Sequence, residues 1–176
     1  SIENETLRHL IDSGKPYLLM LAANRPYKNI YTVSKVFKRL TTEYSDLHLL
    51  TLKYGHVING HHIDIPFLSD SDLEHAYKHA LALIFGSFFE GFGYPPLEAM
   101  RHGTPTIASN VTSIPEILGD AGIYFSPFYP ADLYRAIKQL IENPHCCQSK
   151  MEKRLAEITL RQKQDMQNVI DLLFER

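Results

Sequence analysis

Short apolar runs that alternate with helical patterns constrain the fold of this chain more than any other feature of its sequence. The first run, residues 17–22 (YLLMLA), follows Gly14 and Pro16, which favour turns. Comparable runs follow at residues 47–52, 63–67, 81–85, 106–108 and 123–125. Because they are continuous rather than alternating, these runs are typical of strands that are buried on both faces.

The segments between these runs carry apolar residues at the three- and four-residue spacing of a helix. Ser69 is the first of several N-cap candidates, while Pro95 and Gly103 stand at the start and just past the end of a short helix. The predicted helices cover residues 30–40, 69–79, 95–102, 114–118, 133–143 and much of a polar tail, 148–176. Strands that alternate with helices predict an α/β fold, a Rossmann-like, doubly wound parallel sheet flanked by helices.

The composition excludes several classes of protein. With 176 residues, of which 44% are hydrophobic and 22% charged, residues 1–176 are expected to form one globular domain rather than a disordered segment. No apolar run approaches the ~20 residues that cross a bilayer, so no transmembrane segment is expected. The first ten residues show no secretory signal. The net charge of −2 argues against a nucleic-acid-binding protein.

The cysteines and histidines favour neither disulfides nor metals. Cys146 and Cys147 are adjacent, so they form neither a disulfide framework nor a Cys-based zinc site, and we expect a reducing, cytoplasmic setting. Peripheral contact of the tail with the inner face of a membrane is an alternative that its offset charges do not favour. His75 and His79 share one helix face, but a third ligand is not evident, so no metal site is predicted.

The loop at residues 86–98 combines features that suit a phosphorylated ligand. It follows a predicted strand, and in doubly wound sheets ligands bind outside the carboxyl ends of the strands. Gly91 and Gly93 permit close approach of the backbone, and the next helix presents an N-terminus that attracts anions. The two prolines at its start have no N–H, so Leu97 and Glu98 are the first helical donors predicted for a phosphate.

Two carboxylates flank this turn. Glu90 and Glu98 have seven residues between them, and ionised carboxylates accept hydrogen bonds from the hydroxyl groups of sugars. Glu98, expected in the first helical turn, is suited to a ribose, and Glu90 to a hexose. The alternatives are that Glu98 only complements the helix dipole and that Glu90 is solvated.

The loop after the first strand carries the positive charge that a diphosphate requires. Arg25 and Lys28 lie there, Arg as a bidentate donor and Lys as a point charge. A solvated basic turn is the alternative. A polar cluster from Thr104 to Ser113 follows another strand, and its Ser, Thr and Asn side chains favour caps and turns.

These residues carry a resemblance to a known family. The segment E-G-F-G-Y-P-P-L-E-A-M-x-x-G-T-P-x-I-A-S-N at residues 90–110, followed by I-P-E and G-D-A-G, resembles the donor-binding, C-terminal domain of retaining family 4 glycosyltransferases of the GT-B fold, the glycosyl transferases group 1. The resemblance implies that Glu90 orients the donor hexose and Glu98 binds the ribose. It also implies backbone contacts to the sugar and phosphate from Gly91, Phe92 and Gly93, and neutralisation of the diphosphate by Arg25 and Lys28. It further implies that residues 110–113 lie near the donor, and turn formation alone stays open as the alternative for them.

The resemblance further implies a nucleotide-diphosphate-sugar-binding domain that takes part in hexosyl transfer to a hydroxyl acceptor, in polysaccharide, glycan or glycolipid synthesis. The donor would be a UDP- or GDP-sugar, with no further cofactor required. The sequence departs from the family pattern in the short spacing from Arg25 to Lys28, and Tyr94 stands where a smaller aliphatic residue is usual. No N-terminal acceptor domain is recognisable, so this domain alone is not expected to be competent in catalysis and would need that domain or a partner subunit.

Two alternatives stay open at this point. The first is a non-catalytic donor-binding subunit of a two-chain transferase. The second is a sugar-nucleotide epimerase of the same architecture, which would need catalytic acids of its own and a second domain.

Overall fold

A computed structural model of the chain describes residues 2–174. Its centre is a parallel sheet of six strands in the order β3-β2-β1-β4-β5-β6. The strands are β1 (Tyr17–Met20), β2 (His48–Leu52), β3 (His62–Ile65), β4 (Ala82–Phe85), β5 (Thr106–Ser109) and β6 (Ile123–Phe125). Neighbouring strands all run parallel, which confirms the predicted doubly wound α/β fold.

The chain reverses its direction of winding beside β1. It proceeds outward from β1 through β2 to β3, then returns to β4, which pairs with the other side of β1. In open α/β sheets this point of reversal forms a crevice at the carboxyl ends of two strands, where ligands bind. The loops that follow β1 and β4 therefore define the candidate site.

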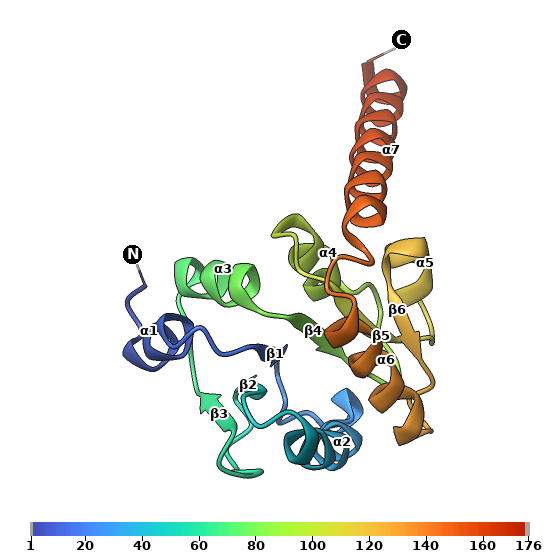
Figure 1. The fold of residues 1–176 in the computed structure, drawn as a ribbon. Helices are drawn as coiled ribbons and strands as arrows, with labels where there is room; N and C mark the ends of the chain where they lie inside the picture. Colours follow the sequence, from blue (N-terminus) through green and yellow to red (C-terminus); the bar gives the residue numbers. More distant parts are fainter. Residues whose placement is uncertain (1, 175–176) are drawn as a thin grey trace.

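Helices cover both faces of the sheet (Figure 1). One face carries α2 (Ile30–Glu43) and α6 (Pro130–Glu142), which pack against each other. The other face carries α1 (Glu5–Asp12), α3 (Asp70–His79), α4 (Tyr94–Arg101) and the first part of α7 (Gln148–Phe174). Three short elements complete the connections: η1 (Pro26–Lys28), α5 (Ile114–Leu118) and η2 (Gly119–Ala121).

The central strands are mostly apolar because both of their faces are buried. Every residue of β1, β4 and β5 is buried. The helices contribute one apolar stripe each, as α2 does with Val33, Val36, Phe37 and Leu40. Burial of this apolar surface is the main stabilising contribution, and it holds the loops at the carboxyl edge on a rigid base.

The helix α1 was not predicted from the sequence. Its N-cap is Asn4, whose side chain accepts a hydrogen bond from the Leu7 amide, and the helix buries Leu7 and Leu10. Asp72, buried in α3, accepts hydrogen bonds from the amides of residues 3 and 4 and joins the two helices. Of the N-cap candidates for α3, Ser69 is the one that caps it.

Several predicted boundaries differ from those of the structure by one to three residues. The strand expected over residues 63–67 is β3, His62–Ile65, because Pro66 has no N–H to donate and Phe67 is exposed. The helix expected to open at Pro95 begins one residue earlier, at Tyr94. The second shift changes which groups lie at the open end of α4.

The predicted helical tail is α7, which extends away from the rest of the protein (Figure 1). Met151 is buried at its base, and Leu155 and Ile158 pack partly against the core. Residues 159–170 are all exposed. Among residues 2–174, no helix has both the length and the apolar character needed to cross a membrane.

Candidate functional site

The loops after β1 and β4 meet through an ion pair. The Nζ of Lys28 lies 2.5 Å from Oε1 of Glu90, and the two side chains are only 12% and 15% exposed. The Lys28 ammonium also lies over the ring of Phe85, 4.6 Å from its centroid. Lys28 and Glu90, predicted separately as site residues, are therefore in contact at the point where the sheet reverses.

The backbone around Lys28 is held by Asn29. This residue is 4% exposed and has a left-handed conformation, with φ of 63°, between η1 and α2. Its side-chain amide donates to the carbonyl of Pro127 at 3.1 Å. Asn tolerates positive φ better than most residues, so Asn29 can end η1 where a glycine would otherwise be favoured. Lys28, the residue before it, reaches Glu90 in the loop after β4.

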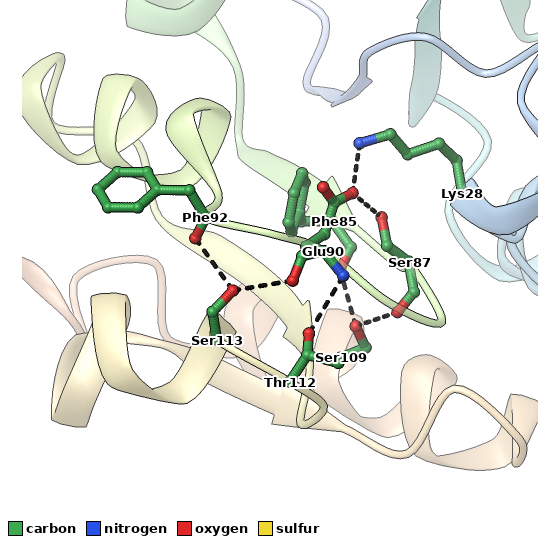
Figure 2. Close-up of polar contacts among 8 residues, drawn as sticks. All are labelled: Lys28, Phe85, Ser87, Glu90, Phe92, Ser109, Thr112 and Ser113. Atoms are coloured by element: carbon green, nitrogen blue, oxygen red, sulfur yellow. Dashed lines mark hydrogen bonds and ion pairs between the residues drawn. The ribbon is translucent and has the colours of Figure 1, made fainter.

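The Glu90 carboxylate has a second partner in Ser87. The Ser87 hydroxyl donates to Oε1 of Glu90 at 2.6 Å, and Ser87 is itself completely buried. Its carbonyl accepts from the Ser109 hydroxyl on β5, also at 2.6 Å. Figure 2 shows the resulting chain of contacts from Ser109 through Ser87 to Glu90 and Lys28.

The backbone of Glu90 is held from the opposite side by the loop between β5 and α5. The Thr112 hydroxyl accepts from the Glu90 amide at 3.2 Å, and Ser113 donates to the carbonyls of Glu90 and Phe92 at 3.1 and 3.3 Å (Figure 2). Thr112 has a φ of 52°, which costs a β-branched residue on the order of 1–3 kcal/mol. Part of the polar cluster thus supports Glu90 directly.

The turn that contains Gly91 and Gly93, here called the glycine turn, ends in an unusual backbone conformation. Gly93 has a φ of 103° and is the N-cap of α4, and a Cβ at this position would lie 3.1 Å from Cδ1 of Ile117. Because α4 begins at Tyr94, the amides at its open end are those of Gly93 and Tyr94. The predicted donors Leu97 and Glu98 lie further along the helix, and the side chain of Leu97 is buried.

Glu98 occupies the second turn of α4, so the prediction of a first-turn residue was wrong. The cause is the earlier start of the helix, and the first turn contains no acidic residue. A partial charge at a helix end acts mainly within the first turn, which weakens the alternative of a helix-dipole partner. The Oε2 of Glu98 instead accepts a hydrogen bond of 2.9 Å from the hydroxyl of Tyr77 on α3.

The other predicted residues are more open. Arg25 is exposed at the start of η1, and Tyr94 is 66% exposed, with its ring 4.6 Å from that of Phe92. Gly91, Phe92 and Leu97 border a groove of about 440 Å³ between α4, α5 and α7, which Lys28 and Glu90 do not line. The glycine turn therefore separates this groove from the ion pair.

A cluster of polar side chains holds the loop between β2 and β3. Thr51 donates to Oδ1 of Asp64 at 2.6 Å and contacts Nε2 of His62 at 2.8 Å, while the Ile58 amide donates to Nδ1 of His62 at 3.2 Å. Burial lowers the pKa of His62, against the opposing charge of Asp64. The folded loop therefore requires neutral His62, with one ring nitrogen free to accept.

This requirement predicts a pH dependence of stability. The pKa of His62 is ~6.5 when unfolded and lower when folded, so the unfolded chain binds more protons as the pH falls through this range. We expect the free energy of unfolding to decrease between pH 7.5 and pH 5.5, measured by urea denaturation. His62→Gln should reduce this slope and the exposed control His79→Gln should retain it; equal slopes for the wild type and His62→Gln would contradict the assignment.

The described part of the chain has no candidate metal centre. Over residues 2–174, no group of three or more His, Cys, Asp or Glu side chains is arranged to hold a metal ion. His75 and His79 stack on each other with their ring centroids 6.2 Å apart.

The fold and the site together define a doubly wound α/β domain with a largely buried ion pair, Lys28–Glu90, at its strand reversal. Comparison with known families then identifies the chain. It matches the family described as Glycosyl transferases group 1 over residues 1–162 and belongs to that family. The predicted GT-B glycosyltransferase resemblance is thereby confirmed at the level of the family.

Several curated relatives are mannosyltransferases. The chain is 49% identical over 63 residues to O-antigen chain mannosyltransferase B of Escherichia coli, covering 36% of this chain and 16% of that protein. It is 31% identical over 141 residues to the serotype-specific mannosyltransferase WbdA of Escherichia coli, covering 71% and 17%. It is 29% identical over 138 residues to O-antigen chain mannosyltransferase RfbU of Salmonella typhimurium, covering 73% and 39%.

Solved structures share the fold. A UDP-forming α,α-trehalose-phosphate synthase from Burkholderia vietnamiensis superposes with a TM-score of 0.78 at 10% identity, over 97% of this chain and 44% of that one. A second such enzyme, from Burkholderia xenovorans, gives 0.73 over 88% and 43%. The chain thus spans less than half the length of these relatives.

Proposed function

We propose that this domain binds a nucleotide-diphosphate sugar and contributes to transfer of its hexosyl group to a hydroxyl acceptor with retention of configuration. One observation carries the proposal: Lys28 and Glu90, from two loops far apart in sequence, meet at the strand reversal beside a glycine turn. A cation, a carboxylate and open backbone amides are the groups that recognise a diphosphate joined to a sugar.

Lys28 stabilises the leaving group in this proposal. When the bond between the sugar and the diphosphate breaks, negative charge grows on the diphosphate, and a fixed ammonium lowers the energy of that state. The Glu90 contact and the Asn29 anchor hold Lys28 in place before the donor binds. Arg25 adds positive charge from the exposed side of the loop, so no metal is required.

In this proposal, the carboxylates of Glu90 and Glu98 bind different parts of the donor. Glu90 keeps Oε2 available for a hexose hydroxyl, while Oε1 accepts from Lys28 and Ser87. Glu98 accepts from the ribose. Backbone amides of Gly91, Phe92, Gly93 and Tyr94 face the sugar and phosphate, and the exposed ring of Tyr94 borders the sugar.

We further propose that the transferred sugar is mannose and that the pathway is polysaccharide synthesis. The support is that three curated relatives carry the word mannosyltransferase in their names, two of them with the words O-antigen chain. Acceptor binding falls to another domain or subunit, in keeping with the share of the relatives that this chain spans. The free Cys146 and Cys147 support a reducing, cytoplasmic setting.

A thermal-shift panel tests the binding function. GDP-mannose, UDP-glucose and ADP-glucose are added to the purified protein, each at increasing concentration. A ligand present at 100 times its dissociation constant stabilises the fold by roughly 2.7 kcal/mol, or roughly 5–11 °C in Tm for a domain of this size. We expect GDP-mannose or a UDP-sugar to give this shift and mannose 1-phosphate, the control without a nucleoside, to give little. If all three nucleotide sugars leave Tm unchanged, the proposed function is wrong.

A further inference from the structure

The two carboxylates of the site are held in unlike ways. Glu90 has Lys28 and Ser87 on its carboxylate and two further residues on its backbone. Glu98 has a single side-chain partner among residues 2–174, the Tyr77 hydroxyl at 2.9 Å from Oε2. Any fixed orientation of Glu98 within α4 therefore depends on Tyr77.

Tyr77 is rigidly placed. It is 1% exposed on α3, and its carbonyl accepts a hydrogen bond of 2.6 Å from the Thr104 hydroxyl. Its ring is stacked on that of His102, with the planes 16° apart and the centroids separated by 5.7 Å. These contacts join α3 to the end of α4, so the hydroxyl reaches Glu98 from a fixed position.

The Tyr77 hydroxyl is also a constant donor. Burial, and then the charge of Glu98, raise the pKa of Tyr77 far above its ordinary value, so the proton stays on the phenol at every physiological pH. A phenol without its proton could not donate to a carboxylate. The contact therefore fixes Oε2 as the occupied oxygen and leaves Oε1 to accept from another group.

We propose that Tyr77 is a positioning residue for ribose recognition: its hydroxyl holds Oε2 of Glu98 so that Oε1 accepts from the ribose hydroxyls of the bound nucleotide. This inference rests on the proposed function, in which Glu98 binds the ribose. It adds a residue that lies outside the loop at residues 86–98, on the helix α3. This residue determines whether the site distinguishes ribose from a 2′,3′-dideoxyribose.

The test compares two probes, GDP and 2′,3′-dideoxy-GDP, with UDP and its dideoxy form measured in parallel by calorimetry. The wild type is expected to bind the ribonucleotide about tenfold more tightly, as a hydrogen bond to a charged group implies. Tyr77→Phe should reduce this ratio to about threefold or less, while the affinity for the dideoxy form stays within about twofold.

Tyr17→Phe is a matched control. Tyr17 is also 1% exposed, and its hydroxyl donates to a carbonyl of α3, that of Ala76, at 2.7 Å. The control loses the same atom from a contact to the same helix and should keep the wild-type ratio. Should Tyr77→Phe not fold, Thr104→Val, which releases the Tyr77 carbonyl, should lower the ratio in the same direction.

The outcomes distinguish failure of the ribose role of Glu98 from failure of the positioning role of Tyr77. A wild-type ratio near one refutes the ribose role of Glu98 and this inference with it. A tenfold wild-type ratio that Tyr77→Phe leaves unchanged overturns the role of Tyr77 alone, and so does an equal loss in Tyr17→Phe. A loss confined to Tyr77→Phe supports the proposal.

Discussion

Replacing Lys28 by Ala is expected to lower kcat/KM for glycosyl transfer by about 10²–10³-fold, the loss typical when one preorganised donor to a developing negative charge is removed. The ammonium is largely buried, held by Glu90 at 2.5 Å, and it comes from the loop next to the glycine turn. Its removal takes away fixed positive charge and also leaves Glu90 without its ion-pair partner. The measurement is transfer from the nucleotide sugar by the enzyme that contains this domain.

A matched control separates this effect from a general loss of charge. Lys35 lies on α2, is exposed, and stands over the ring of Tyr31, 4.1 Å from its centroid. Lys35→Ala removes the same group from a surface position and should change kcat/KM by less than about twofold. Activity of Lys28→Ala within threefold of the wild type would contradict a role for Lys28 in stabilising the leaving group.

Much of the fold could be predicted because its strands are buried on both faces. Apolar runs such as residues 17–22 and 81–85 are flanked by residues that favour turns, so a buried strand is the structure that fits them best. The helix α1 was missed although Asn4, Leu7 and Leu10 carry its signal, an N-cap followed by apolar residues at helical spacing. One short helix leaves only a short pattern of apolar residues in the sequence. The alternation of strands and helices, by contrast, is repeated along the chain and is easier to recognise.

The site was predictable in its residue types but not in its pairing. A parallel sheet places the loops after β1 and β4 at one edge, which is why Lys28 and Glu90 could be named from sequence. Their contact, and the supports from Ser87 and Ser113, depend on side-chain directions that spacing does not determine. Tyr77 was missed because it lies on another helix, and only the packing of α3 against α4 brings it to Glu98.

Replacing Gly93 by Ala should destabilise the protein and weaken donor binding together. The φ of 103° is costly for any residue with a Cβ, and the added carbon would lie 3.1 Å from Cδ1 of Ile117. We expect the free energy of unfolding to fall by roughly 1–3 kcal/mol, measured by urea denaturation. Relief of this strain would change the entry into α4, so affinity for the nucleotide sugar that binds the wild type should fall at least tenfold by calorimetry.

Gly91→Ala is the control within the same turn. A Cβ at Gly91 would have no atom within 4 Å, and this glycine does not have a positive φ. The substitution should therefore change the free energy of unfolding by no more than about 0.5 kcal/mol. If Gly93→Ala proves as stable as Gly91→Ala and binds donor equally well, the backbone conformation at the start of α4 is not what shapes the phosphate end of the site. If Gly93→Ala is destabilised relative to Gly91→Ala and also loses donor affinity, the positive φ at the start of α4 is a conformation that the ligand requires.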